Sequence, residues 1–555
     1  MIEENKNKTF LGFDFSTQRL KAIVISEDYK VLQEADVEFD VDLPDFPHYI
    51  HYTLCIYFRY KLIFIVFDDT IDRTSGGVVK GENGEVTAPP LLWVKALDMV
   101  MDRLIVAGVD FSTIEALSGA AQQHGSVWWA KGSEERLKSL SSEDFLHSQL
   151  ASTFMANSPV WMDSSTSADC RALEEAVGGA EELAKITGSR AYERFTGAQI
   201  RKMFRTRPRT YSATERISLV SSFACSLFLG QYAPIDLADG SGMNLLDIHT
   251  MKWCEQALKA CGNEHLATKL GTPVPSATVV GKISQYFVKR YGFTPECEVI
   301  AFTGDNCSAL AGLRLRSGCV GLSLGTSDTL LLGLQEARAP PAGHILVGPT
   351  TDAPYMALLC FSNGSLTRQN HRDRLVGTSW DAFNELLRST VRGNMGYMGI
   401  YYDTAEIVPR AVAGKWVWES NGRSLDKCAP QFEARALLEG QALARRAHAE
   451  DMGFRLDSRS RLVATGGASV NKELLQIFAD VFHTPVYVQE EHANAALLGA
   501  AIRAAEVWSA HTGTKLTGSE PTIFPVANPY PDSEAIYTPM LQRYRQYVET
   551  IPKLQ

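Results

Sequence analysis

The stretch Leu11-Gly-Phe-Asp-Phe-Ser-Thr-Gln-Arg-Leu20 decides the fold, because its pattern returns at Val320-Gly-Leu-Ser-Leu-Gly-Thr-Ser-Asp-Thr329. Both stretches read apolar, glycine, apolar, polar, apolar, small, threonine and then polar residues. This pattern predicts two antiparallel strands joined by a hydroxyl-rich turn, once near the start of each half. Turn chemistry shared by unrelated hairpins is one explanation. The other, which we favour, is a pair of similar α/β domains facing each other across a cleft.

Short apolar runs alternate with helical patterns along the rest of the chain, which is typical of an α/β architecture. Strands are expected at residues 114–118, 298–303, 461–465 and 485–489. A small-residue helix is expected after residue 304, and an Ala-rich helix over 494–508. Between them, Leu474, Phe478, Val481 and Phe482 have the spacing of one helical face.

The composition is that of a globular protein. Of the 555 residues, 45% are apolar and 21% are charged. The net charge of −10 argues against a nucleic-acid or anionic-membrane partner. Ten scattered cysteines without a CxxC pair argue against a disulfide framework or zinc site. The polar N-terminus and the short apolar runs predict a soluble protein of the cytoplasm, because a membrane helix needs about 20 apolar residues.

One segment, residues 49–72, does not fit the surrounding pattern. It is dense in Tyr, Phe, Ile and Lys and has no clear period. A buried strand pair and an insertion without a place in the fold are both open readings. Our hypothesis is that it is a translated non-coding stretch, which mass spectrometry of peptides from these residues in the natural protein would refute.

The two repeated turns carry groups that suit phosphate binding. Ser16-Thr17 and Gly325-Thr326-Ser327 offer N–H and O–H donors, and glycine permits a close approach of phosphate. Asp14 lies beside the first turn, where a carboxylate can hold a divalent metal through water. Each turn alone is weak evidence, since Ser/Thr hairpins are common, but the pair favours phosphoryl transfer.

Asp305 follows an apolar strand, at the place where open α/β sheets bind ligands. At a helix N-terminus its carboxylate is favoured in the ionised form and can accept a proton from a substrate hydroxyl. The competing interpretation of a lone aspartate here is a helix N-cap.

Further candidate residues follow other strands. Gly466-Gly467-Ala468 would let a flat ligand lie against the main chain, with Asn471 supplying a side-chain hydrogen bond. His124 is placed to bind a polyol hydroxyl. For the glycine pair, His124, Arg194 and Trp380, a purely structural role is the alternative. The chain has no GxxxxGK[ST], GxSxG or HExxH motif and no GxGxxG after a strand, so P-loop, hydrolase, zinc-protease and dinucleotide-binding chemistry are poorly supported.

These residues bring out a resemblance to the FGGY carbohydrate kinases, and within them to the eukaryotic subgroup that acts on xylulose. The similarity runs from Phe10 to about Ala505. Its motifs are Gly12-Phe-Asp-Phe-Ser-Thr-Gln18, Gln122-Gln-His-Gly-Ser126, Ser158-Pro-Val-Trp-Met-Asp-Ser-Ser165, Thr187-Gly-Ser-Arg-Ala-Tyr-Glu-Arg-Phe-Thr-Gly197, Asp239-Gly-Ser-Gly-Met-Asn244, Phe302-Thr-Gly-Asp-Asn306, Ser323-Leu-Gly-Thr-Ser-Asp328 and Ala464-Thr-Gly-Gly-Ala-Ser469.

The resemblance implies two actin-like (ribonuclease H-like) ATPase domains flanking a cleft. It implies a sugar-binding domain over residues 1–297, with 49–72 as an atypical insert, and a nucleotide-binding domain over 298–555. It also implies transfer of the ATP γ-phosphoryl group to a primary hydroxyl of D-xylulose with the help of Mg²⁺. Ser16 stands where the wider family has glycine, and Cys307 where the subgroup often has proline.

Roles carry over to the matching positions. Asp305 would be the general base and would hold the sugar together with His124, Arg194 and Asn306. The metal would be served by Asp14. Nucleotide and phosphate would be held by Ser16, Thr17, Gly325, Thr326, Ser327, Trp380, Gly466, Gly467, Ala468 and Asn471.

Only the resemblance names the sugar. Kinases for glycerol, gluconate or ribulose are the nearest alternative, because a pocket of His, Arg, Asp and Asn suits any small polyol. An actin- or Hsp70-like ATPase that binds a partner is the alternative of another class. A silent protein disabled by the insert is the third. The expected partners are a small sugar and ATP, with no nucleic acid and no membrane, in a monomer or homodimer.

Overall fold

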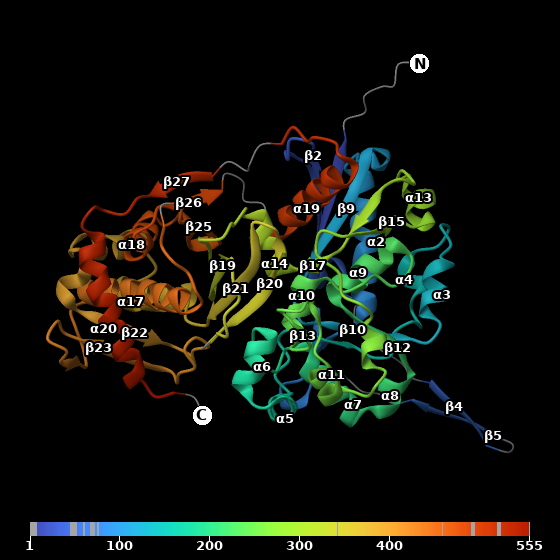
Figure 1. The fold of residues 1–555 in the computed structure, drawn as a ribbon, viewed down its shortest axis with the longest axis horizontal. Helices are drawn as coiled ribbons and strands as arrows, with labels where there is room; N and C mark the ends of the chain where they lie inside the picture. The colour runs from blue at the N-terminus through green and yellow to red at the C-terminus, as the bar shows by residue number, and fades with distance from the viewer. Residues whose placement is uncertain are drawn as a thin grey trace. The chain divides into compact units, whose positions relative to one another are not determined.

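The computed structural model describes residues 8–44, 53–58, 61–66, 73–74, 77–340, 342–457, 459–489, 494–518 and 523–553 (Figure 1). The chain forms two compact units. The first unit comprises Met1–Leu183, Ala191–Ala309 and Ala496–Gly518. The second comprises Ala184–Arg190, Leu310–Ala495 and Ser519–Gln555. The assignment of sugar and nucleotide binding to domains 1–297 and 298–555 stays a prediction.

The first unit is built on a mixed sheet with the strand order β15-β16-β9-β1-β2-β3, in which β17 also pairs with β9. Strand β1 runs antiparallel to β2 and parallel to β9. The strands are β1 (Thr9–Phe15), β2 (Arg19–Ser26), β3 (Val31–Glu38), β9 (Ile114–Ala121), β15 (Val279–Lys282), β16 (Glu298–Ile300) and β17 (Thr303–Gly304).

Both faces of β1 are covered, so every residue of this strand is buried. On one face, the Phe13 ring lies 4.7 Å from that of Phe228 in α9 (Val220–Leu229), between ring centroids. On the other face, Gly12 packs against Ala501 of α19 (Ala495–Thr512). Because side chains alternate along a strand, Asp14 lies on the same face as Gly12. The strand therefore directs this acid to the α19 side of the sheet.

The second unit repeats this arrangement. Its sheet has the order β20-β21-β19-β18-β25-β26-β27, with β18 antiparallel to β19 and parallel to β25. The strands are β18 (Cys319–Leu324), β19 (Asp328–Leu334), β20 (His344–Thr350), β21 (Ala353–Phe361), β25 (Arg461–Thr465), β26 (Val486–Gln489) and β27 (Ile523–Ala527). Both repeated stretches thus form hairpins with equivalent neighbours, which confirms the predicted pair of α/β sheets.

Helices surround the two sheets within their own units. In the first unit, α2 (Pro90–Val106) packs on β2 and β3, and α14 (Asp305–Gly312) follows β17 directly. In the second unit, the long helix α17 (Pro430–Asp451) contacts four other helices. They are α15 (Ser365–Val376), α16 (Trp380–Arg388), α18 (Lys472–Phe482) and α20 (Ser533–Thr550).

The strand predicted at residues 298–303 is interrupted. Strand β16 ends at Ile300 and β17 begins at Thr303. The carbonyl oxygen of Ala301 accepts a hydrogen bond from Arg503 Nη2 at 2.7 Å and from Ser118 Oγ at 3.2 Å. These side chains take the place of a sheet partner, so the ladder breaks before the chain reaches Asp305.

Within the segment 49–72, residues 53–58 and 61–66 form the antiparallel hairpin β4–β5 (Thr53–Phe58 and Lys61–Val66), a two-stranded sheet of its own. The other residues of this segment lie outside the described part of the chain. That the segment is a translated non-coding stretch stays a hypothesis to be tested.

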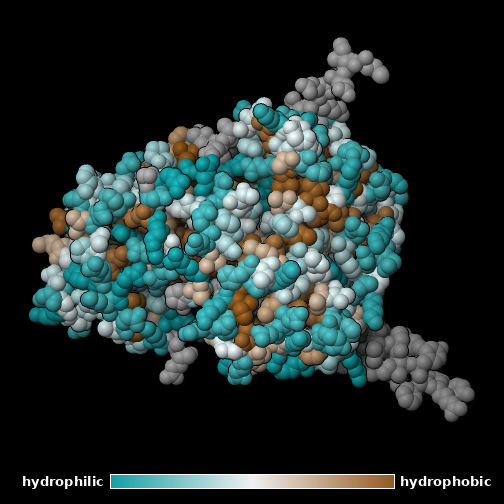
Figure 2. Space-filling model, in the orientation of Figure 1, coloured by the Kyte–Doolittle hydropathy of each residue, from teal (hydrophilic) through white to brown (hydrophobic). Residues whose placement is uncertain are grey.

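Across the described residues, every helix is too short or too polar to serve as a membrane span. On the face shown in Figure 2, hydrophilic side chains predominate and hydrophobic ones form separate groups.

We predict that Gly12→Ala lowers the free energy of unfolding by about 1–3 kcal/mol, the usual cost of overpacking. An added Cβ would lie 2.6 Å from the backbone nitrogen of Ala501, and neither β1 nor α19 yields easily. Gly81→Ala is the control, because its Cβ would meet only the flexible side chain of Glu85. Urea denaturation measures both. Equal stability of the two variants would contradict the packing of β1 on α19.

Candidate active site and nucleotide pocket

Three neighbouring strands of the first unit end together. Phe15 at the end of β1 pairs with Ala121 of β9, and Ala121 pairs with Gly304 of β17. The chain continues from these ends into Ser16, Gln122 and Asp305. Because β1, β9 and β17 are parallel, these continuations meet at one edge of the sheet.

Asp305 begins α14 at this edge. Its Oδ1 accepts hydrogen bonds from the backbone N–H of Asn306 at 2.7 Å and from Asn306 Nδ2 at 2.9 Å. The sequence predicts that the helix N-terminus favours the ionised carboxylate, but burial outweighs this effect and raises the pKa of Asp305 to about 7. The negative charge of Asp14 adds to the increase. A carboxylate with a near-neutral pKa is well matched to accept a proton from an alcohol.

Asp14 is 1% exposed and lies close enough to Asp305 for their charges to interact. Its Oδ2 accepts a hydrogen bond from the Ser16 hydroxyl at 2.6 Å. The structure thus brings together the acid of the first turn and the acid at the start of α14. They are 291 positions apart in the sequence (305 − 14).

His124 lies just beyond the end of β9 in a left-handed conformation, with φ of 73°. Its Nδ1 lies 2.9 Å from the carbonyl oxygen of Gly242, which can only accept, so Nδ1 carries the proton. In the neutral ring Nε2 is then the acceptor. The imidazole stacks on Phe195 at 4.4 Å between ring centroids, which fixes its plane.

Arg194 is held by aromatic rings. Its guanidinium carbon lies 4.6 Å from the ring centroid of Tyr192 and 6.0 Å from that of Trp161. Trp161 Nε1 donates a hydrogen bond to the Thr17 hydroxyl at 2.8 Å. This contact links Arg194 to the first hydroxyl-rich turn, so the predicted sugar and phosphate residues of the first unit form one continuous cluster.

The sequence reading did not select Gln123, which lies at the centre of this cluster. Its Oε1 accepts a hydrogen bond from Asn306 Nδ2 at 3.0 Å, and its Nε2 donates to Cys307 Sγ at 3.5 Å. A Cβ on Gly304 would lie 2.5 Å from Gln123 Cγ and 2.8 Å from Asp239 Oδ1. Glycine is needed at position 304 because these two side chains occupy the space that a Cβ would fill. They therefore pack directly on the backbone that precedes Asp305. The only signal in the sequence was its place next to His124.

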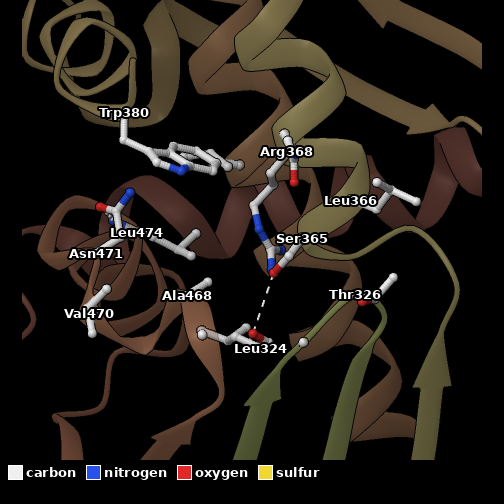
Figure 3. Close-up of a pocket in the computed structure, with 14 residues that line it drawn as sticks. Leu324, Thr326, Ser365, Leu366, Arg368, Trp380, Ala468, Val470, Asn471 and Leu474 are labelled. Carbon is white, nitrogen blue, oxygen red and sulfur yellow. Dashed lines mark hydrogen bonds between the residues drawn. The ribbon is translucent and has the colours of Figure 1, made fainter. Parts of the chain in front are cut away.

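The second unit contains a cavity of about 500 Å³ (Figure 3). Trp380 and Asn471 lie on one side of it and Thr326 on the other. Of the predicted nucleotide residues, the lining includes Gly325, Thr326, Trp380, Gly467, Ala468 and Asn471. Lining residues that the sequence analysis missed are Leu324, Ser365, Leu366, Arg368, Gln369, Leu438, Val470 and Leu474.

Of the nucleotide residues predicted in the second unit, Ser327 and Gly466 do not line the cavity. Ser327 completes the turn after Thr326. Gly466 has φ of 86°, and a Cβ there would lie 2.8 Å from the carbonyl oxygen of Leu324. Gly466 therefore serves the close approach of the β25 end to β18, while its neighbour Gly467 faces open space.

Trp380 is an aromatic wall of the cavity. The guanidinium carbon of Arg372 lies 4.5 Å from the ring centroid of Trp380. Arg372 itself does not line the cavity, so this contact supports the indole without occupying the ligand space.

Asn471 caps α18, with its Oδ1 accepting a hydrogen bond from the Leu474 N–H at 3.2 Å. Its Nδ2 lies 3.3 Å from Asn384 Oδ1. Asn471 therefore has a structural role as a helix cap, and it still borders the cavity.

Comparison with known proteins identifies the class of this protein. Residues 151–312 match the N-terminal domain, and residues 320–508 the C-terminal domain, of the FGGY family of carbohydrate kinases. The chain is 46% identical to a xylulose kinase of Rattus norvegicus over 556 residues, covering 99% of this chain and 98% of that protein. It is 43% identical to xylulose kinase 2 of Arabidopsis thaliana, covering 94% and 90%.

Solved structures agree on the fold. A xylulose kinase from Rhodospirillum rubrum matches with a TM-score of 0.74 at 16% identity, covering 98% of this chain and 99% of the other. Plasmodium falciparum glycerol kinase with ADP matches with a TM-score of 0.72 at 15% identity, covering 99% of both chains. The chain is a carbohydrate kinase. It belongs to the FGGY family, as the motifs of the sequence indicated.

We predict that Gly467→Val weakens ATP binding by about tenfold or more, or about 1.4 kcal/mol, with little change in the melting temperature. An added Cβ meets no atom of the protein within 4 Å, so the new side chain occupies space that we assign to the nucleotide. Isothermal titration calorimetry with ATP measures the affinity. An unchanged dissociation constant would remove Gly467 from the nucleotide site.

Proposed function

We propose that the protein transfers the γ-phosphoryl group of ATP to a primary hydroxyl of D-xylulose, giving D-xylulose 5-phosphate. The observation that carries the choice of sugar is the 46% identity to the rat xylulose kinase over nearly the whole of both chains. The fold alone does not choose, because a gluconate kinase and a glycerol kinase share it with TM-scores of 0.73 and 0.72.

In this proposal Asp305 is the general base. It takes the proton of the attacking hydroxyl while the hydroxyl oxygen forms a bond to the γ-phosphorus and the bond to the ADP oxygen breaks. Its pKa of about 7 and the two hydrogen bonds from Asn306 support this role, since they hold an acceptor at a fixed place.

His124, Arg194 and Asn306 complete the sugar site. The acceptor Nε2 of His124 suits a sugar O–H, and the guanidinium of Arg194 suits sugar oxygens. The hydrogen bond from Asn306 to Gln123 supports a fixed amide orientation beside the base. We assign this sugar site to the first unit.

ATP is the co-substrate that the family implies. We assign its base and ribose to the cavity of the second unit, with Trp380 as the stacking wall and Gly466, Gly467, Ala468 and Asn471 along one side. The phosphates are assigned to Ser16, Thr17, Gly325, Thr326 and Ser327. Among the residues that the structure describes, the N–H groups of Thr326 and Ser327 donate no hydrogen bond within the protein, which suits an anion.

Mg²⁺ fits the acids of the first unit. Asp14 and Asp305 are oxygen donors whose mutual repulsion a divalent cation would relieve, and Mg²⁺ prefers such ligands. No cluster of three or more His, Cys, Asp or Glu side chains suited to a metal occurs in the described part of the chain. We therefore assign the ion to Asp14 with water and nucleotide phosphate, where it would neutralise phosphate charge. We also propose a cytoplasmic monomer or homodimer.

The test of the substrate is a coupled ADP-release assay across D-xylulose, D-ribulose, glycerol and gluconate, with and without residues 49–72. We expect the highest kcat/KM with D-xylulose. A higher value with another polyol would reassign the substrate. No ADP release with any of them, from a folded protein that binds ATP, would indicate a silent member of the family.

We predict that Asp305→Asn lowers kcat by about 10²–10⁴-fold with nucleotide affinity unchanged, because the proton acceptor is lost. The same variant should be more stable at neutral pH. The pKa of Asp305 lies above its unfolded value, so ionisation destabilises the folded state as pH rises through about 7. The gain in melting temperature should be largest near pH 8 and vanish near pH 4.

The exposed carboxylate of Asp102 supplies the control. Asp102→Asn should leave kcat unchanged. Unreduced turnover in Asp305→Asn would remove this residue from the role of base, and a lower melting temperature at pH 8 would contradict the destabilising charge.

A further inference from the structure

A buried ion cluster follows directly on the second hydroxyl-rich turn. Asp328, the first residue of β19, is gripped at both carboxylate oxygens by Arg368 of α15, at 2.8 and 2.9 Å. Arg445 of α17 donates a third hydrogen bond to Asp328 Oδ2 at 2.8 Å. The three side chains are 0%, 1% and 2% exposed, respectively. Burial favours the neutral acid, but the two guanidinium groups outweigh it and lower the pKa of Asp328.

Arg368 borders the nucleotide cavity but has few N–H groups left for a ligand. Its Nη1 also donates to Gln441 Oε1 at 2.9 Å, and its Nη2 also donates to Ser365 Oγ at 2.7 Å. All four terminal N–H groups are therefore used inside the protein. Figure 3 shows the Arg368 side chain extending toward Ser365, the first residue of the same helix α15. The Nε of Arg368 is buried and has no hydrogen-bond partner among the described residues, so the effect of Arg368 on a nucleotide passes through the groups that it holds.

The group it holds is the turn. The N–H groups at the start of α15 donate to the turn carbonyls, from Ser365 to Gly325 at 3.1 Å and from Leu366 to Thr326 at 3.3 Å. In a trans peptide the next N–H points opposite to the carbonyl. The N–H groups of Thr326 and Ser327 therefore point away from the start of α15.

The packing of α15 on the turn is tight. A Cβ on Gly364 would lie 2.6 Å from the backbone nitrogen of Asp328 and 2.7 Å from the carbonyl carbon of Ser327. Only glycine permits this contact. The ion cluster adds a second connection between α15 and the turn. Arg368 belongs to α15, and Asp328 is the first residue of β19, the strand that follows the turn.

We propose that Arg368 is a positioning residue for the phosphate end of the nucleotide. By holding Asp328 against α15, with Arg445 as the second contact, it keeps the turn in the conformation that presents the Thr326 and Ser327 N–H groups to phosphate. The proposal rests on the proposed function only in taking a nucleoside di- or triphosphate as the ligand of the cavity.

The test compares ADP with adenosine, which shares the base and ribose but lacks the phosphates. Isothermal titration without sugar measures both ligands on the wild type, Arg368→Met and Arg368→Lys. We expect Arg368→Met to weaken the binding of ADP by about tenfold or more and the binding of adenosine by less than about twofold. Arg368→Lys should restore part of the loss, since it keeps the charge but not the planar fork.

Arg446→Met is the matched control. Like Arg368, Arg446 is a buried arginine, but it lies in α17. It donates hydrogen bonds to Glu450 and to the carbonyl oxygen of Val481. Its loss should lower stability and leave the ratio of ADP to adenosine affinity unchanged. Should Arg368→Met fail to fold, Arg368→Gln keeps Asp328 paired with Arg445 and is expected to show the same selective loss.

Equal weakening of ADP and adenosine, or no weakening of either, would overturn the positioning role. These results are separate from a failure of the proposed function. If the wild type bound neither ADP nor ATP, the nucleotide assignment itself would fall. A different preferred sugar would leave the role of Arg368 untouched.

Discussion

The structure depends on one electrostatic constraint, the placing of two carboxylates together at a buried sheet edge. Burial and the charge of Asp14 raise the pKa of Asp305 to about 7, so the folded chain carries a cost there at neutral pH. The surrounding hydrogen bonds offset part of this cost. They come from Asn306 to Asp305 and from Ser16 to Asp14. A cation and a substrate hydroxyl are the ligands that would relieve the rest.

The two units share one sheet topology, and we propose that they serve different tasks. In the first unit, three strand ends gather acids and a histidine into a cluster suited to a polyol. In the second, the equivalent hairpin turn borders a cavity with an aromatic wall, suited to a nucleotide. The turn of the second unit is held by an ion cluster, whereas Ser16 in the first closes its turn through a hydrogen bond from its N–H to the Arg19 carbonyl oxygen. The two repeats thus share one architecture and differ in the side chains that surround their turns.

Much of the fold and part of the candidate site could be predicted from the sequence. The hairpins at 9–26 and 319–334 are confirmed, because alternation and turn chemistry are local signals. The strand at Arg461–Thr465 and the helix with Leu474 and Phe478 on its buried face are confirmed for the same reason. The two acids were found because Asp14 lies near the end of a recognisable strand and Asp305 directly follows one.

The remaining features are set by contacts between distant parts of the chain. The partner of Gln123 is Asn306, and the partners of Asp328 lie in α15 and α17, far along the sequence. No local pattern marks such pairs, since glutamine and arginine are ordinary surface residues. The break between β16 and β17 depends on Arg503, more than two hundred residues further on.

The most direct test of the account is a crystal structure of the protein with D-xylulose bound. The account predicts a primary hydroxyl oxygen of the sugar about 2.6–3.2 Å from a carboxylate oxygen of Asp305. A sugar bound with every hydroxyl beyond reach of this carboxylate, or bound away from the ends of β1, β9 and β17, would contradict it.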